Sequence, residues 1–395
     1  MVSLLHIALI IVLALAALPV AVLLTQTLAA LKQTRVMSIT THWRPSVAVL
    51  VPAHNEAQGI AATIASIREQ LRDGDRILVV ADNCSDDTVA VALAAGAPVL
   101  ERSNLEQRGK GYALDYGMQQ LAHSPPEVVI MIDADCRLLE GTVDRLACLA
   151  MTAQRPVQAL DLMQAKKNSG LKMRIAEFAW IVKNHVRPLG FLRLGLPCQL
   201  MGTGMAFPWS LIHQASLANG NLAEDMQLGI EMARKNAAPI FCPEACVISY
   251  FPVGEEAVRM QRTRWEHGHM SMILHDGLPL LIQGLRRGDR MLIALALDMC
   301  VPPVALLTLL TFALFIVAAA AYFMFAWIAP LILAACSLSG LMLAVLLAWR
   351  RFGRHVLSLK DLFSTVTYVF WKLPLYLKFF VSRQVEWVRA KRDAD

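Results

Sequence analysis

Two carboxylate motifs directly follow short apolar runs of the kind that form strands. Asp133 and Asp135 follow VVIMI, and Asp82 ends RILVVAD. Alternate residues of an extended chain point to the same side, so Asp133 and Asp135 can face one cation. Mg²⁺ and Mn²⁺ prefer such oxygen ligands, and phosphate oxygens commonly complete their coordination. The pattern indicates a site for a metal ion and a diphosphate, although an ordinary loop after a strand is also rich in Asp.

Asp82 is a candidate contact for a nucleobase or a ribose. Acidic groups at strand ends accept hydrogen bonds from such groups in other doubly wound folds. The polar residues that follow have a simpler explanation, because Ser85 or Asp86 can cap a helix that begins near Thr88. Lys110 in QRGKGYAL adds a cation between two glycines, which permit close approach of the backbone to a ligand.

Asp225 follows Glu224 in LAEDMQLG, where a helix is expected to begin. Paired acids at that position are also explained by the helix dipole. Group transfer to a hydroxyl nevertheless needs a base for the hydroxyl proton, and a carboxylate can take that role. Gly202 and Gly204 in MGTGMAF lie upstream, where the missing side chains would leave room for an acceptor.

The motif QRTRW contains Gln261, Arg264 and Trp265 at helical spacing, which places the three side chains on one helix face. Arg264 offers a fork of donors for a diphosphate, and Trp265 offers an apolar ring for stacking. An amphipathic helix at a membrane surface explains the same composition. Both interpretations can hold together.

The elements that position these residues alternate between strand and helix. SVAVLVP, RILVVAD and VVIMID are apolar runs typical of buried strands, and Ile60, Ile64, Ile67 and Leu71 recur at helical spacing between the first two. Glu56 lies near the start of that helix. The alternation predicts an α/β domain with a mixed, mostly parallel sheet and a binding crevice at the carboxyl ends of its strands. Because no GxGxxG or Walker A motif is present, a dinucleotide-binding or P-loop enzyme is disfavoured.

Composition indicates a polar domain with membrane segments. The chain has 395 residues, 56% of them hydrophobic and 17% charged, with eight scattered Cys that suit a reducing compartment. The net charge of +6 suggests anionic lipid headgroups as partners and no nucleic acid, because basic residues cluster beside apolar segments. These residues are Arg350, Arg351, Arg354, Arg383, Arg389, Lys391 and Arg392.

Residues 4–31, 300–324 and 327–349 are long enough to cross a bilayer, which needs about 20 apolar residues. A cleaved signal peptide is the alternative for the first, but its basic residues follow the apolar run. The positive-inside rule places the polar domain in the cytoplasm, so we expect a multi-pass protein of the inner (plasma) membrane. Residues 359–381 either span or lie in the interface, and the basic tail favours the interface.

These patterns predict five parts. Residues 1–35 form an N-terminal transmembrane helix, 36–254 a cytoplasmic catalytic domain, and 255–292 interface helices that carry QRTRW. Residues 293–350 form a transmembrane hairpin, and 351–395 an interfacial helix with a basic cytoplasmic tail.

The ordered motifs PAHNEA, ADNCSDDT, RGKGYAL, DAD, AED and QRTRW resemble the membrane-bound family 2 glycosyltransferases, which include cellulose, chitin and hyaluronan synthases and ceramide glucosyltransferases. The resemblance covers about residues 47–265. It implies a GT-A fold and transfer from a UDP-sugar with inversion at the anomeric carbon.

The resemblance also implies roles for particular residues. Glu56, Asp82, Lys110 and Asp133 would bind the donor, and Asp135, with Asp133, would hold Mg²⁺ or Mn²⁺. Asp225 would be the base, Gln261 and Arg264 would hold the diphosphate, and Trp265 would flank the acceptor.

We expect transfer of one sugar or a few to a lipid-linked saccharide, of the polyprenyl diphosphate type, or to a glycolipid, as in bacterial exopolysaccharide assembly. Three predicted spans are few for a polymer conduit. A processive polysaccharide synthase is the alternative, and a non-catalytic nucleotide-binding membrane protein is a remote one. The sequence leaves the donor sugar, the acceptor, the linkage and the oligomeric state open.

Overall fold

The computed structural model describes residues 2–32, 43–167, 169–218, 223–252, 255–362, 364–365 and 376. By contact the chain divides into two compact units. The α/β unit comprises Thr34–Lys167, Leu196–Trp265 and Val385–Asp395. The helical unit comprises Met1–Gln33, Asn168–Gly195 and Glu266–Gln384.

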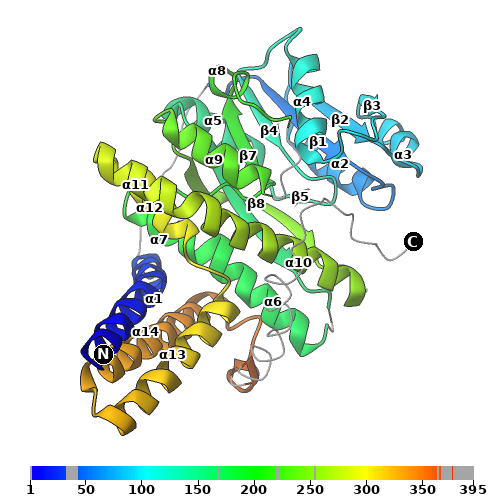
Figure 1. The fold of residues 1–395 in the computed structure, drawn as a ribbon. Coiled ribbons are helices and arrows are strands. Elements are labelled where there is room, and N and C mark those ends of the chain that lie inside the picture. Colours follow the sequence, from blue (N-terminus) through cyan, green and yellow to red (C-terminus); the bar gives the residue numbers. More distant parts are fainter. Residues whose placement is uncertain are drawn as a thin grey trace. The chain divides into compact units, whose positions relative to one another are not determined.

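The strands described in the α/β unit form one eight-stranded sheet, as Figure 1 shows. Its order is β3 (Val99–Arg102), β2 (Arg76–Asp82), β1 (Val47–Ala53), β4 (Val128–Met131), β7 (Met205–Pro208), β6 (Val157–Gln164), β8 (Ile240–Tyr250) and β5 (Arg137–Leu138). The strands from β3 to β4 are parallel, β7 is antiparallel to both its neighbours, β6 and β8 are parallel, and β5 is antiparallel to β8. The prediction of a mixed, mostly parallel α/β fold is confirmed.

Helices cover both faces of the sheet, which explains why its strands are continuously apolar. Alternate residues of β1 divide between the faces, with Val49 on one side and Leu50 on the other. Helices α2 (Ile60–Arg68) and α5 (Thr142–Ala153) pack on the Val49 side. Helices α4 (Lys110–Leu121), α8 (Trp209–Ile212) and α9 (Glu224–Arg234) pack on the Leu50 side. Helix α3 (Thr88–Ala94) follows β2.

The predicted apolar spacing of α2 is found in the structure. Ile60, Ile64 and Ile67 are fully buried against the sheet. The helix ends at Arg68, so Leu71 lies beyond it, although Leu71 still packs against the same core.

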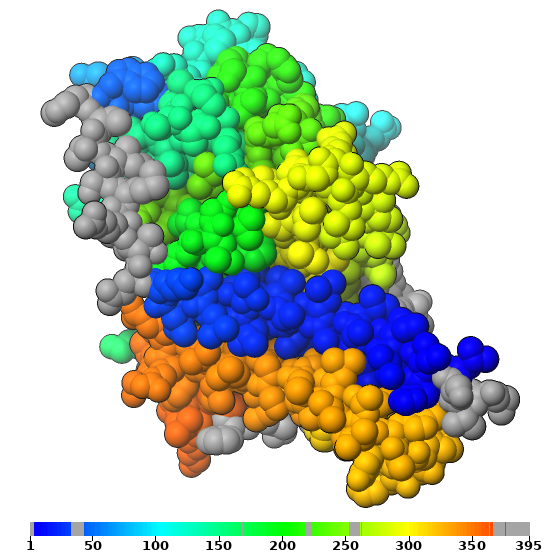
Figure 2. All heavy atoms as spheres, turned by 90° about the vertical axis from the view of Figure 1, so that its left-hand side faces the viewer, coloured from blue at the N-terminus to red at the C-terminus, as the bar shows by residue number. Residues whose placement is uncertain are grey.

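The helical unit contains three helices that are long and apolar enough to cross a membrane, among the residues that the structure describes. They are α1 (Val2–Ala30), α13 (Val304–Phe325) and α14 (Ile328–Ala348), and they agree with the three predicted spans. Leu13, Ala318 and Ala334 form a core between them. Leu13 packs with Ala334, and a Cβ on Gly340 would lie 3.6 Å from Val20, so the contacts advance in the same direction along α1 and α14 and the two helices run parallel. Figure 2 shows them side by side.

Shorter helices complete this unit. They are α6 (Leu171–Ile181), α7 (Arg187–Arg193), α11 (Leu278–Arg287), α12 (Arg290–Met299) and the π-helices η1 (Val182–Val186), η2 (Ile273–Gly277) and η3 (Trp349–Gly353). Helix α10 (Glu255–Met272) begins in the α/β unit and ends in the helical unit.

Residues 168–195 group with the apolar helices, whereas the boundaries expected from the sequence put them inside the catalytic domain. Close packing explains the grouping, since a Cβ on Gly190 would lie 2.0 Å from the Gln26 carbonyl oxygen. The buried Asp298 carboxylate also accepts hydrogen bonds from Gln26 Nε2 at 2.6 Å and from Arg187 Nη2 at 2.8 Å. The composition of 168–195 resembles that of the catalytic segment, so the sequence does not reveal this division. Most of the predicted interfacial helix and the basic tail lie outside the described residues.

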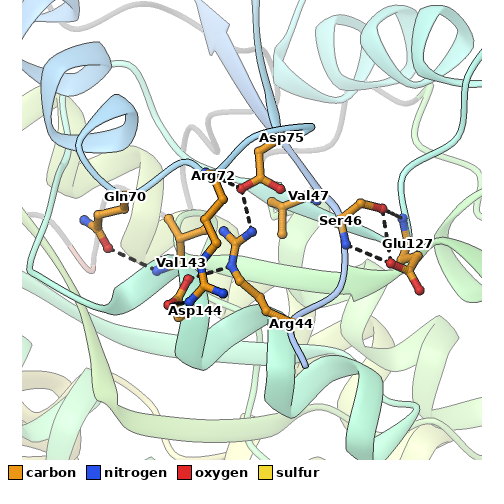
Figure 3. A network of polar contacts seen from close by, with 9 residues as sticks. All are labelled: Arg44, Ser46, Val47, Gln70, Arg72, Asp75, Glu127, Val143 and Asp144. Carbon is orange, nitrogen blue, oxygen red and sulfur yellow. Dashed lines mark hydrogen bonds and ion pairs between the residues drawn. The ribbon is translucent and has the colours of Figure 1, made fainter. Parts of the chain in front are cut away.

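A buried ion-pair network secures the edge of the sheet where β1 and β2 begin (Figure 3). Arg44 Nη1 lies 2.5 Å from Asp75 Oδ2, and Arg44 Nε lies 2.5 Å from Asp144 Oδ1. Asp75 also accepts a hydrogen bond from the Val47 amide at 2.9 Å. The Arg44 and Asp75 side chains are only 4% and 2% exposed, so removal of one partner leaves the other charge buried.

We predict that Arg44→Met lowers the free energy of unfolding by about 3–5 kcal/mol, because it leaves Asp75 buried and unpaired. Urea unfolding of the purified chain in detergent measures this change. Arg72→Met is the matched control, since Arg72 pairs with the same Asp144 but is 56% exposed, and its loss should cost less than about 1 kcal/mol. Equal losses in the two variants would contradict the assignment.

Candidate active site

The loops after β1 and β2 are joined to each other at the carboxyl ends of the strands. Asn55 Oδ1 accepts a hydrogen bond from the Ser85 amide at 2.7 Å. The Glu56 amide donates to Thr88 Oγ1 at 2.7 Å, so Glu56 lies at this junction. Asp86 accepts from the Thr88 amide at 3.0 Å and from the Ala57 amide at 3.1 Å. Asp86 thus links the two loops. The N-cap residue of α3 is Asp87, whose side chain makes no cap hydrogen bond, so the expected cap at Ser85 or Asp86 is not found.

An ion pair with Arg102 holds the Asp82 side chain at the end of β2. Its carboxylate accepts hydrogen bonds from Arg102 Nη1 at 2.6 Å and from Asn83 Nδ2 at 3.0 Å, both at Oδ1. The Arg102 and Asp82 side chains are 10% and 8% exposed. Arg102 fixes the direction of this carboxylate. Both hydrogen bonds are accepted by Oδ1, so a ligand could donate to Oδ2.

Lys110 lies at the centre of a group of carboxylates, at the first residue of α4. Its ammonium group contacts Asp133 Oδ1 and donates to the Gly202 carbonyl oxygen at 2.7 Å. Burial alone would lower the pKa of Lys110, but the Asp133, Glu224 and Asp225 carboxylates together raise it. Lys110 therefore stays charged and offsets three carboxylates from two segments, the turn after β4 and the start of α9.

The MGTGMAF loop shapes the space between Lys110 and Asp225. A Cβ on Gly202 would lie 3.4 Å from Asp225 Oδ2 and 3.5 Å from Lys110 Nζ. Gly202 has a φ of +90°, a backbone conformation that residues other than glycine rarely adopt. The Asp133 amide donates to Thr203 Oγ1 at 3.1 Å, which joins this loop to the end of β4.

Glu224 and Asp225 are the first two residues of α9. Burial and the neighbouring Asp225 raise the pKa of Glu224 to about 7, although Lys110 acts in the opposite direction. Asp225 Oδ1 accepts a hydrogen bond from the Met226 amide at 2.8 Å. Of two adjacent acids, one therefore holds a proton near neutral pH.

A pocket of about 220 Å³ opens beside this pair of acids. Its walls combine charged and apolar side chains. They comprise Lys110, Gly111, Leu114, Met205, Ser216, Leu217, Glu224, Asp225, Gln227, Leu228, Glu231 and Arg234. The volume is below the roughly 300–1,000 Å³ of sites for drug-sized ligands, so it suits one small polar ring.

Asp133 and Asp135 do not share a strand, which corrects the reason given for their common direction. Strand β4 ends at Met131, and a turn closed by a hydrogen bond from the Cys136 amide to the Asp133 carbonyl (3.1 Å) contains both acids. Thr63 Oγ1 holds this turn by donating to the Ala134 carbonyl at 2.8 Å. Burial, Asp135 and Asp133 raise the pKa of the Cys136 thiol well above its usual range.

Two carboxylates suit a metal that also takes phosphate oxygens. Within the described ranges, no group of three or more His, Cys, Asp or Glu side chains is placed to hold an ion without other ligands. Mg²⁺ in phosphate-transfer sites commonly binds one or two carboxylates and takes its remaining ligands from phosphate and water. The residues present therefore fit a cation that arrives with a diphosphate.

Gln261, Arg264 and Trp265 lie on α10, as their spacing predicts. Gln261 is buried, and Arg264 and Trp265 are half-buried. Their approach to the carboxylates around Lys110 stays a prediction.

Two residues of this arrangement carry little signal in the sequence. Arg102 belongs to no motif, and only the parallel pairing of β2 with β3 brings it to Asp82. Glu224 is visible as an acid beside Asp225, but its proton affinity depends on burial, which spacing does not show.

Comparison with known proteins identifies the family. The family model described as "Glycosyltransferase like family 2" matches residues 45–268, which is more than half of the chain and includes every candidate site residue. The chain belongs to this glycosyltransferase family. The match confirms the family part of the resemblance drawn from the motifs.

Curated relatives carry the same kind of name. The probable glycosyltransferase YdaM of Bacillus subtilis (strain 168) is 26% identical over 257 residues, which cover 58% of this chain and 56% of that protein. An uncharacterized glycosyltransferase of Mycobacterium tuberculosis (strain H37Rv) is 36% identical over 123 residues, 29% of this chain and 51% of the relative. The chain thus spans about half the length of the curated relatives it matches.

A solved structure confirms the GT-A-like fold. The mannosyltransferase PcManGT from Pyrobaculum calidifontis, in complex with GDP-Man and Mn²⁺, matches with a TM-score of 0.54 and 19% identity. The match covers 87% of this chain and 99% of that one.

We predict that the ligand-free glycosyltransferase loses stability as the pH rises from about 4.5 to about 7, because Glu224 titrates. Its folded pKa of about 7 lies above its ordinary value of 4.5, so the folded chain keeps a proton that the unfolded chain has lost. The stabilisation is complete below the ordinary value and is lost through pH 7. Urea midpoints measured with chelator present should show this fall in the wild type and a flatter profile in Glu224→Gln.

Glu231→Gln is the control for this measurement. Glu231 lies on the same helix and lines the same pocket, but it is partly exposed and pairs with Lys235 at 2.7 Å. The control should retain the wild-type profile. An unchanged profile in Glu224→Gln would contradict the assignment.

Proposed function

We propose that this family 2 enzyme transfers a sugar, with inversion, from a UDP-sugar to a lipid-linked saccharide or a glycolipid at the cytoplasmic face of the inner membrane. The supporting observation is Lys110, which lies between the end of β4 and the start of α9 and contacts or offsets Asp133, Glu224 and Asp225. Such a group combines a diphosphate site with a carboxylate base. The bound GDP-Man and Mn²⁺ of PcManGT support a nucleotide-sugar donor with a divalent metal.

The donor nucleotide is assigned to the ends of β1 and β2. Asp82, held by Arg102, accepts hydrogen bonds from the base, and Glu56 lies beside the nucleotide at the loop junction. Asp135 and Asp133 hold Mg²⁺ or Mn²⁺ together with the diphosphate. When bound, this metal neutralises charge on the leaving diphosphate. Lys110 places a second positive charge beside the same oxygens.

Asp225 is assigned as the base. The acceptor hydroxyl oxygen forms a bond to the anomeric carbon, its proton passes to the Asp225 carboxylate, and the bond to the nucleoside diphosphate breaks. Burial and the neighbouring Asp225 raise the pKa of Glu224 to about 7, so Glu224 is the member of the pair that takes up a proton near neutral pH. Gly202 places no side chain beside Asp225 Oδ2, where a Cβ would lie 3.4 Å away.

The QRTRW residues are assigned to the same reaction. Gln261 and Arg264 hold the diphosphate by hydrogen bonds, and Trp265 flanks the acceptor sugar with its ring.

A lipid acceptor is supported by the apolar surface of the helical unit. Besides the three long helices, Leu274, Leu278 and Leu285 form an exposed stripe on η2 and α11, each 62% exposed. The opposite face of α11 is buried at Leu280 and Gly284. With Arg286 and Arg287 in its last turn, α11 has the composition of a helix that lies on an anionic membrane.

We predict that Asp225→Asn lowers kcat by about 10²–10⁴, because the amide cannot take the hydroxyl proton. Nucleotide release with an acceptor measures the rate, and titration with UDP should give a nearly unchanged Kd. Asp115→Asn is the control, since Asp115 lies on α4 and its carboxylate accepts a hydrogen bond from the exposed Gln119 side chain at 2.7 Å. Retained transfer in Asp225→Asn would contradict the assignment of Asp225 as the base. UDP binding without any transfer by the wild type would instead favour a non-catalytic nucleotide-binding protein.

We predict that chelation abolishes transfer and that added Mn²⁺ or Mg²⁺ restores it, because the diphosphate must approach Asp133 and Asp135. UDP affinity measured by calorimetry should fall with chelator in the wild type. In Asp135→Asn, the UDP affinity should depend less on the metal. Full activity in excess chelator would refute the metal assignment.

A processive synthase is the remaining alternative within the family. Product length separates the two functions, since labelled donor yields one discrete lipid product in single transfer and a ladder in polymerisation.

A further inference from the structure

The ends of α1 and α14 meet two arginines in the helical unit. Because the two helices run parallel, the end of α1 near Ala30 and the start of η3 lie at the same end of the helix pair. Arg193, the last residue of α7, donates to the Ala30 carbonyl oxygen and lies 3.4 Å from that of Ala29. Arg351 belongs to η3, directly after α14.

A histidine and a phenylalanine connect these arginines. The His185 ring meets the Phe352 ring edge-on, with centroids 5.0 Å apart, and Arg351 Cζ lies 5.7 Å from the centre of the same Phe352 ring. Burial, Arg193 and Arg351 together lower the pKa of His185 to about 4. Burial and Arg351 also lower the pKa of Arg193. His185 is therefore neutral between two permanent cations.

Other arginines of the helical unit pair with carboxylates, and Arg193 and Arg351 differ from them in the described part of the chain. Arg174 bonds both oxygens of Asp361 at 2.7 and 3.2 Å, and Arg187 bonds Asp298. Among the described residues, neither Arg193 nor Arg351 has a carboxylate within 4.0 Å. The Arg193 Nε is shielded from solvent without a hydrogen-bond partner in the same part of the chain. An anion would stabilise these two cations and could accept a hydrogen bond from Arg193 Nε.

We infer that Arg193 and Arg351 bind the phosphate group of a membrane lipid. Guanidinium forks match phosphate oxygens in geometry, and a neutral imidazole can donate one further hydrogen bond. The site lies at the ends of two helices of membrane-spanning length, where a lipid phosphate is found, and Phe352 gives it an apolar wall. The inference rests on the proposed membrane placement of the helices and not on the transfer chemistry.

The test uses the full chain in neutral detergent and four soluble probes. They are dioctanoyl phosphatidylglycerol, dioctanoyl phosphatidylcholine, farnesyl phosphate and inorganic phosphate. We expect Arg193→Gln combined with Arg351→Gln to weaken binding of phosphatidylglycerol or farnesyl phosphate at least about tenfold, as loss of charge-assisted hydrogen bonds predicts. Whichever of these two probes binds more tightly identifies the lipid class. Phosphatidylcholine should bind more weakly, since its headgroup has no net charge.

Arg350→Gln is the matched control, because it removes one positive charge from the residue directly before Arg351. Adjacent residues of a helix point to different sides. Arg351→Gln alone serves if the double variant fails to fold, since Arg351 is exposed. The inference is overturned if the variants bind lipid as the wild type does, if Arg350→Gln loses as much, or if inorganic phosphate binds as tightly as the lipids. Asp225→Asn should bind lipid normally, so failure of the proposed transfer reaction remains distinguishable.

Discussion

The contact between Lys110 and Asp133 is the interaction on which the candidate active site depends. Without a cation at this point, the turn after β4 and the start of α9 would bring like charges together, and their repulsion would open the site. Lys110 offsets this charge and bonds the Gly202 carbonyl oxygen, so one side chain joins three segments. In the proposed function, this contact prepares the diphosphate site before the donor arrives, which is how preorganised sites reduce the cost of binding.

The sheet makes this contact possible. Buried β1 and β4 pair in parallel, and helices on both faces hold their ends in place. The ion-pair network around Arg44 and Asp75 lies at the opposite end of the strands, where β1 and β2 begin. Stability and chemistry are thus placed at opposite ends of the strands, as is common in open α/β sheets.

Much of the α/β unit could be predicted from the sequence because its signals are local. Buried strands are continuous apolar runs, and Ile60, Ile64 and Ile67 mark one helix face at short range. The position of Arg102 against Asp82 is not local, since it follows from which strands pair. Asp133 and Asp135 lie in a turn held by Thr63 from α2, so alternation along a strand does not describe them, and their role as metal ligands stays a prediction. The grouping of 168–195 with α1 likewise depends on the close approach of Gly190 to Gln26, which has no pattern in the sequence.

The central claim is that the carboxylates around Lys110 serve sugar transfer from a nucleotide donor. The most direct measurement is nucleoside diphosphate release by the purified chain, with Mn²⁺ and a lipid extract as acceptor, across a panel of UDP-sugars and GDP-sugars. The account predicts release from one UDP-sugar well above the others, dependent on the lipid extract and lost in Lys110→Met. Release from no donor in the panel, or equal release by Lys110→Met, would contradict it.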